Sequence, residues 1–229
     1  LMKPYGCSMR SALPAFGGRG MRSALLGGHA SDHSEQTGGV NRLIQEMRGG
    51  SALGYQVRRA QPADAPAIAA VARETWAATY RGIIPEEVQR AVLPQWYAEE
   101  RLARAAESGQ SAFFVAEAEA GEVVGFAQAG HREEAGDAEL WRFYVLPDHQ
   151  RKGIGRQLLQ ACLDALHAQG PVSRLFVQVE AENEGGRRAY EALGFTYVRE
   201  YPDELLGHVT QMWEMCLEPA VLRPRAEEA

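Results

Sequence analysis

Short hydrophobic runs separated by turn residues predict seven β-strands along the chain. The runs are rich in Val, Phe, Tyr and Leu, which suit a pleated, half-buried surface. Residues 119–122 lie between the second and third runs and predict the turn of a hairpin. The expected strands cover residues 55–58, 113–116, 123–126, 139–145, 175–179, 195–201 and 209–217.

Helical spacing of apolar residues predicts about four helices between these strands. One begins at Asp64 and Pro66 and runs through Trp76, and residues 85–107 are rich in helix formers. A further apolar helical face covers residues 158–166, and residues 186–193 are expected to form the last helix.

The order of these elements predicts a single α/β (α+β) domain built on a mixed, mostly antiparallel, twisted sheet. The step from the strand at 139–145 through a helix to the strand at 175–179 predicts one parallel pair. We expect the domain to cover residues 55–218. Residues 1–54 are glycine-rich without a sustained apolar period, which predicts a disordered extension, and residues 219–229 are expected to be a short frayed tail.

The five-residue sequence MRSAL occurs at residues 9–13 and again at residues 21–25. This repetition suggests translated upstream sequence, with the true start of translation at a later Met. A transit peptide is the less favoured alternative, because no clear amphipathic helix accompanies the arginines.

The charge of the expected domain limits the kinds of molecule that it is expected to bind. Residues 55–218 carry 16 basic and 25 acidic side chains, which argues against a nucleic-acid partner. An acidic surface is consistent with steering of a cationic amine, although an ordinary solvated surface kept for solubility is the favoured explanation of the net charge alone.

No apolar run is long enough to span a membrane, and the cysteines and histidines lack metal-ligand spacing. We therefore expect a cytoplasmic protein without a metal.

A glycine-containing loop lies between the expected strand at 139–145 and the next helix. Gly153 and Gly155 allow close backbone approach, and a helix N-terminus offers unpaired N–H groups to an anion. Arg151, Lys152 and Arg156 add positive charge. The spacing fits neither a dinucleotide-binding nor a Walker loop. A pyrophosphate site and a simple turn that binds nothing remain about equally supported by this loop alone.

The wider pattern resembles the GNAT superfamily of N-acetyltransferases. The loop QRKGIG at residues 150–155 is similar to that family's cofactor motif, and Asn183 with Tyr190, followed by Gly194 and Phe195, is similar to a second motif. Gly186 departs from the usual alanine, and with Gly185 it is expected to loosen or delay the helix start. The resemblance implies a central parallel pair splayed for CoA and acetyl-CoA as co-substrate. The implied cofactor contacts are Phe143, Tyr144, Val145, Gln150, Arg151, Lys152, Gly153, Ile154, Gly155, Arg156, Asn183 and Tyr190.

The resemblance also implies the catalytic roles. An amine acceptor must lose a proton, since a lysine-type amine has a pKa of about 10.4. Glu139 is similar in position to the family's glutamate base, and the alternative is a surface glutamate. Tyr190 matches the general acid that protonates the leaving thiolate, and the alternative is a core tyrosine. Trp76 and Tyr80 occupy the region that lines the acceptor side in related proteins, although core packing explains Trp76 as well.

These observations predict an N-acetyltransferase that acts on a primary amine of a small molecule, a peptide N-terminus or a lysine by direct attack in a ternary complex. The alternative is a CoA-binding sensor or a non-catalytic module of the same fold. A homodimer is possible, because the last strand, around Trp213, leaves an edge that could pair with another subunit.

Overall fold

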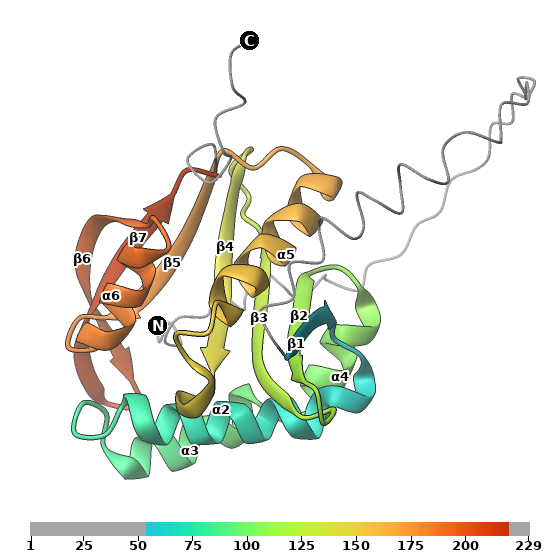
Figure 1. The fold of residues 1–229 in the computed structure, drawn as a ribbon. Helices are drawn as coiled ribbons and strands as arrows, with labels where there is room; N and C mark the ends of the chain where they lie inside the picture. The colour runs from blue at the N-terminus through green and yellow to red at the C-terminus, as the bar shows by residue number, and fades with distance from the viewer. Residues whose placement is uncertain (1–53, 220–229) are drawn as a thin grey trace, which may run out of the picture.

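The computed structural model describes residues 54–219, so the predicted extension at 1–54 and the predicted tail at 219–229 lie almost wholly outside the described residues. It contains a seven-stranded sheet in the order β1-β2-β3-β4-β5-β7-β6 (Figure 1). All neighbouring strands are antiparallel except β4 and β5. The expected mixed sheet with one central parallel pair is confirmed. The strands are β1 (Tyr55–Arg59), β2 (Ala112–Ala118), β3 (Val123–His131), β4 (Asp137–Val145), β5 (Arg174–Glu180), β6 (Thr196–Leu205) and β7 (His208–Leu217).

Five α-helices accompany the sheet within residues 54–219, one more than the roughly four expected. The extra helix arises because the helix-rich stretch at 85–107 is divided into two helices. They are separated by Tyr97 and Ala98, neither of which has a helical backbone. The helices are α2 (Ala65–Thr79), α3 (Glu86–Trp96), α4 (Glu99–Ser108), α5 (Ile154–Gln169) and α6 (Glu184–Ala192).

The helices α2 and α5 lie on opposite faces of the sheet (Figure 1). Tyr144 of β4 accepts a hydrogen bond from Trp76 of α2, whereas the next residue towards the N-terminus, Phe143, contacts Gly155 of α5. Successive side chains of a strand point to opposite faces, so β4 is sandwiched between the two helices. The apolar face expected at residues 158–166 is buried in this core, and Leu158 and Leu166 are fully inaccessible.

A β-bulge interrupts β4 at Trp141. In the pairing of β3 with β4, Gln128 lies opposite Arg142 and the next residue, Ala129, lies opposite Leu140, so Trp141 has no partner. Its ring covers Gly130, where a Cβ atom would come within 2.2 Å of the indole, so only glycine leaves room for it. A bulge of this kind increases the local twist of its strand.

The parallel pair opens at the bulge. The pairing of β4 with β5 ends at Leu140 and Val177, although β4 continues to Val145 and β5 to Glu180. The two strands diverge from this point (Figure 1). The backbone of residues 141–145 therefore has no β5 partner, and an extended ligand can reach its free edge.

Candidate active site

The diverging ends of β4 and β5 enclose a cleft of about 640 Å³. Its walls come from α2, α3, both diverging strands and α6. Eight of the residues predicted from the sequence line this one cleft. They are Trp76, Tyr80, Phe143, Tyr144, Val145, Gln150, Asn183 and Tyr190.

The loop after β4 lies at one end of the cleft. Gly153 has a left-handed backbone (φ 82°) directly before α5, a conformation that costs other residues free energy. The first-turn N–H groups of α5 have no partner within the helix and offer an anion site. Gln150 donates from its side-chain amide to the Val145 carbonyl oxygen at 3.0 Å, which ties the loop to the end of β4.

The charged loop residues surround this site without lining the cleft itself. Lys152 donates to the Tyr55 hydroxyl at 3.2 Å, and Arg151 and Arg156 are exposed. The side chain of Ile154 is 1% exposed and packs in the core, so only its backbone N–H can contact a ligand.

The helix α6 carries the second predicted motif. Asn183 caps it, because its side-chain oxygen accepts a hydrogen bond from the Gly186 N–H at 2.9 Å. The expectation that the glycine pair delays the helix is wrong, since α6 begins at Glu184 and contains both glycines in its first turn. A Cβ at Gly186 would lie 2.5 Å from the Asn183 amide nitrogen, so glycine leaves space for the cap.

Tyr190 stands where the wall of α6 meets β4. Its ring packs against Phe143 and Phe195, with centroid distances of 6.0 and 5.5 Å. Burial, and then the neighbouring Tyr144, raise its pKa above the ordinary value. The phenol is therefore fully protonated at neutral pH and available as a hydrogen-bond donor.

An aromatic cluster closes the other end of the cleft. The Trp76 indole N–H donates to the hydroxyls of Tyr97 and Tyr144 at 3.3 and 3.2 Å, and Tyr97 donates to Tyr144 at 3.1 Å. Trp76 is only 3% exposed yet borders the cleft, so both predicted roles, core packing and lining, apply to it. Burial raises the pKa of Tyr80 and of Tyr97 well above the ordinary value, so these phenols are neutral polar contacts.

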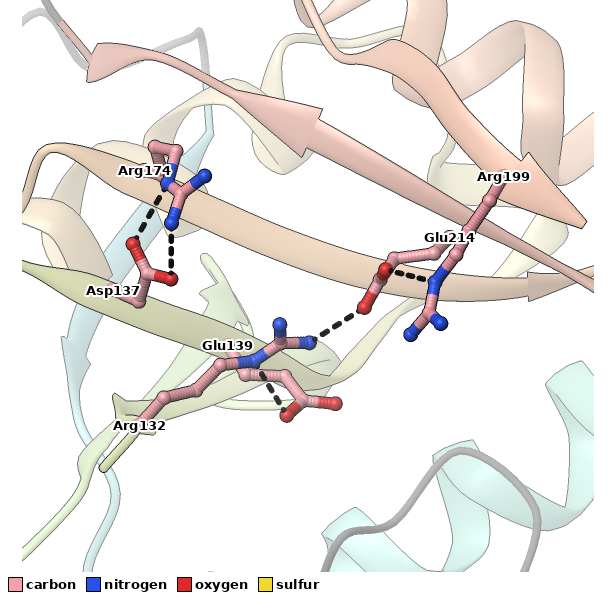
Figure 2. A network of polar contacts seen from close by, with 6 residues as sticks. All are labelled: Arg132, Asp137, Glu139, Arg174, Arg199 and Glu214. Atoms are coloured by element: carbon pink, nitrogen blue, oxygen red, sulfur yellow. Dashed lines mark hydrogen bonds and ion pairs between the residues drawn. The ribbon is translucent and has the colours of Figure 1, made fainter. Parts of the chain in front are cut away.

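Glu139 does not line the cleft, in contrast to Tyr190. It precedes the bulge, is 4% exposed, and accepts a hydrogen bond from Arg132 at 3.2 Å (Figure 2). Burial raises the pKa of Glu139, and the Arg132 charge opposes that shift. The surface glutamate proposed as its alternative is wrong, because the side chain is buried. The structure gives the predicted base role no geometric support.

Arg132 also pairs with Glu214 at 3.1 Å, and Glu214 pairs with Arg199 at 2.7 Å (Figure 2). Burial acts to raise the pKa of Glu214, but the hydrogen bonds from Arg199 and Arg132 outweigh it and lower that pKa. These four residues form a structural ion-pair network that joins β4, β6 and β7 through Arg132, the residue directly after β3.

Glu180 is the carboxylate that sequence reasoning overlooked. It ends β5, is 1% exposed and lines the cleft. One carboxylate oxygen accepts the backbone N–H groups of Glu182 and Asn183 at 2.7 and 2.9 Å, and the other accepts the Thr210 hydroxyl. A charged residue that ends a predicted buried strand, three residues before Asn183, was the available signal.

Comparison with known proteins decides the family. A family model described as "Acetyltransferase (GNAT) family" matches residues 70–195, more than half of the chain. The chain belongs to the GNAT family. As a GNAT protein it is an acyltransferase, and the recognition made from its two motifs is confirmed.

Relatives of this GNAT protein are N-acetyltransferases. The uncharacterized N-acetyltransferase YuaI of Bacillus subtilis is 34% identical over 130 residues, which cover 56% of this chain and 72% of YuaI. The ribosomal protein bS18-alanine N-acetyltransferase of Salmonella typhimurium is 40% identical over 75 residues, 31% of this chain and 50% of that protein. The spermidine N(1)-acetyltransferase of Thermoplasma acidophilum is 29% identical over 147 residues, 62% of this chain and 89% of that enzyme.

Solved structures share the fold. The PaiA N-acetyltransferase of Thermoplasma acidophilum, in complex with coenzyme A, superposes with a TM-score of 0.62 at 25% identity and covers 72% of this chain and 99% of its own. YncA of Salmonella typhimurium with acetyl-CoA gives a TM-score of 0.52 at 25% identity, covering 76% and 98%. These complexes support acetyl-CoA as the co-substrate of this GNAT enzyme.

The cleft fits such a cofactor on its own geometry. The amides at the start of α5 suit a pyrophosphate, and the free edge of β4 suits an extended arm with amide groups. Within residues 54–219, no three His, Cys, Asp or Glu side chains gather to hold a metal ion, and no helix is long and apolar enough to cross a membrane.

Proposed function

We propose that the protein transfers an acetyl group from acetyl-CoA to a primary amine by direct attack within a ternary complex. The observation that carries the proposal is the cleft itself, which opens at the β4 bulge between the glycine-containing loop before α5 and the aromatic cluster around Trp76. Bound acetyl-CoA supplies an activated thioester carbonyl. The chain supplies the binding, the orientation and the proton transfers.

The cofactor contacts divide between backbone and side chains. The amides of Gly153, Ile154, Gly155 and Arg156 hold the pyrophosphate, with the charges of Arg151 and Lys152 nearby. The free edge of residues 143–145 pairs with the pantetheine arm, and a backbone N–H near Val145 polarises the carbonyl. Asn183, already fixed by its cap, contacts the same arm.

Tyr190 acts at the leaving-group side. Its protonated phenol lines the cleft beside Phe143 and donates a proton as the thiolate departs. Fixing the ring between Phe143 and Phe195 orients the hydroxyl before reaction, which lowers the entropic cost of the transfer.

Glu180 is the better-placed carboxylate for the acceptor. It lines the cleft and accepts three hydrogen bonds, which keep its oxygens in one orientation. Because a carboxylate has about four lone-pair sites, one site is left for the acceptor. Its negative charge attracts the ammonium form of the acceptor and then accepts the proton, directly or through water. Glu139 is paired with Arg132 and does not line the cleft. Only its position in the sequence favours it for this role.

The test begins with isothermal titration of acetyl-CoA into the full chain, followed by thiol release with polyamines, amino acids, antibiotics and peptides. Absence of acetyl-CoA binding sinks the proposal. Binding without release for every amine favours the sensor, for which the absence of Glu139 from the residues that line the cleft is the supporting observation.

The base is identified with three matched variants, Glu180→Gln, Glu139→Gln and Glu182→Gln. We expect Glu180→Gln to lower kcat/KM for the amine by roughly 10²-fold or more, as loss of a general base does. Glu182 is exposed at the mouth of the cleft and reports the loss of charge alone, so its variant should stay within about twofold. The acetyl-CoA Kd confirms that each variant is folded. Equal activities of the Glu180 and Glu182 variants would refute the assignment.

A further inference from the structure

A second groove, of about 720 Å³, adjoins the active-site cleft. It is formed by the outer face of α2, the α2–α3 connection, the start of α3 and the first residue of β7, which the fold brings together (Figure 1). Ile83 and Ile84 line both cavities, so one short wall separates the groove from the cleft.

Three arginines line this groove. Arg73 and Arg81 stand two turns apart on α2 and just beyond its end, and Arg90 stands on α3. All three side chains are exposed. Among the described residues, Arg73 and Arg81 have no ion pair or hydrogen bond, and Arg90 donates only to the backbone oxygen of Glu86 at 3.4 Å.

This concentration of positive charge contrasts with the domain as a whole, residues 55–218, in which acidic residues outnumber basic ones by 25 to 16. Glu86 is the single acidic residue among those lining the groove. Guanidinium groups are suited to carboxylate and phosphate, which they hold through paired N–H donors.

The floor of the groove is apolar. Ile84 is 2% exposed, and Ile83, Pro85 and Leu93 continue the surface. An apolar floor with a rim of guanidinium groups that lack ion-pair partners among the described residues suits a ligand that combines a carbon stem with anionic substituents.

From this arrangement we propose that the arginine groove is an acceptor subsite, which selects amines that carry carboxylate or phosphate groups away from the reacting nitrogen. The acceptor's amine enters the cleft near Glu180 while its chain crosses the Ile83–Ile84 wall and its anionic groups meet the arginines. Opposite charges at the two ends set the direction in which the acceptor binds. The inference rests on the proposed transferase function.

The activity test compares two tetrapeptides with free N-termini, Ala-Ala-Glu-Glu-amide and Ala-Ala-Gln-Gln-amide, with the full chain and saturating acetyl-CoA. We expect the acidic peptide to have the higher kcat/KM at low salt, with the advantage shrinking as salt screens the arginines. The triple variant Arg73→Gln/Arg81→Gln/Arg90→Gln should lose about tenfold in kcat/KM for the acidic peptide and about twofold or less for the neutral one.

Arg104→Gln is the matched control, since Arg104 is an exposed arginine on α4 that lines neither cavity. It should leave both peptides unchanged. Inorganic phosphate should compete with the acidic peptide and not with the neutral one, and this competition should vanish in the triple variant. If phosphate instead alters turnover of the neutral peptide through the same arginines, the groove is a regulatory anion site and the acceptor assignment fails. Equal losses for the two peptides, or no loss, also overturn the inference.

A binding measurement keeps this test separate from that of the transferase function. With CoA saturating the pyrophosphate loop, tripolyphosphate should raise the Tm of the wild type and of Arg104→Gln but not of the triple variant. Failure of acetyl-CoA to bind refutes the proposed function, whereas normal acetyl-CoA binding with no tripolyphosphate shift refutes the groove.

Discussion

Replacing Arg132 by Met should destabilise the fold in a pH-dependent manner. Arg132 is the only cation that pairs with Glu139 among the described residues, and it shares Glu214 with Arg199. Its guanidinium also lies 4.1 Å from the centre of the Phe176 ring. Methionine keeps an apolar stem over that ring but leaves the Glu139 carboxylate, 5% exposed in its side chain, without a partner.

Breaking a buried ion pair by removing one partner costs about 3–5 kcal/mol. The lower end applies here, because the Arg132 side chain is 21% exposed and Glu214 keeps Arg199. We expect a loss of roughly 3 kcal/mol in the free energy of unfolding at pH 8, equivalent to a Tm lower by about 6–12 °C for a domain of this size.

The pH dependence follows from Glu139. Its folded-state pKa is already raised by burial, and removal of the opposing Arg132 charge raises it further. The ionised form therefore reduces stability above the folded-state pKa, and this penalty disappears as pH falls through that pKa. The variant should therefore regain part of its deficit between pH 8 and pH 5, because protonation of Glu139 removes the unpaired charge.

Urea denaturation of wild type and variant at pH 8 and pH 5 measures both effects. Adding Glu139→Gln to the variant should restore a similar amount of stability at pH 8, because it removes the unpaired charge. Arg188→Met, which breaks an exposed pair with Glu184, is the matched control and should change stability by less than about 0.5 kcal/mol. The same deficit at both pH values, or no rescue by the second substitution, would show that the carboxylate is not the cause.

Two further outcomes concern the cofactor cleft. Tyr190→Phe keeps the ring contacts with Phe143 and Phe195 but removes the proton donor. The kcat for thiol release should therefore fall roughly 10²- to 10⁴-fold while the acetyl-CoA Kd changes little. A fall below twofold would exclude Tyr190 as the acid. Gly153→Ala places a side chain at φ 82°, a backbone conformation that costs about 1–2 kcal/mol for a residue other than glycine. Acetyl-CoA binding measured by isothermal titration should therefore weaken roughly tenfold. Unchanged affinity would mean that the loop does not hold the pyrophosphate.

The strands and helices were predictable because their patterns are local. The hairpin around residues 119–122 and the parallel pair built from β4, α5 and β5 follow from short-range periodicity and turn chemistry. The predicted position of α6 was late because the glycine pair lowers helix propensity, whereas in the fold the Asn183 cap and the packing of Tyr190 offset that penalty.

The candidate site also contains residues that the sequence predicted and residues that only the tertiary structure identified. The loop at 150–156 and the pair Asn183 and Tyr190 are contiguous motifs, so the sequence located them directly. The choice between Glu139 and Glu180 depended on the Trp141 bulge, since the cleft opens only after it, and on Arg132, which reaches Glu139 from the neighbouring strand. Neither the unpaired bulge residue nor a cross-strand ion pair leaves a periodic signal.

The sequence by itself determined the order of the strands and helices, their approximate positions, and the two motifs that mark the family, because these properties reside in neighbouring residues. Only the tertiary structure decided where β4 and β5 separate, which carboxylate meets the cleft, and that arginines from α2 and α3 share a groove with the start of β7. Those features arise from contacts between segments far apart in the chain, and their energies depend on burial and charge that exist only after folding.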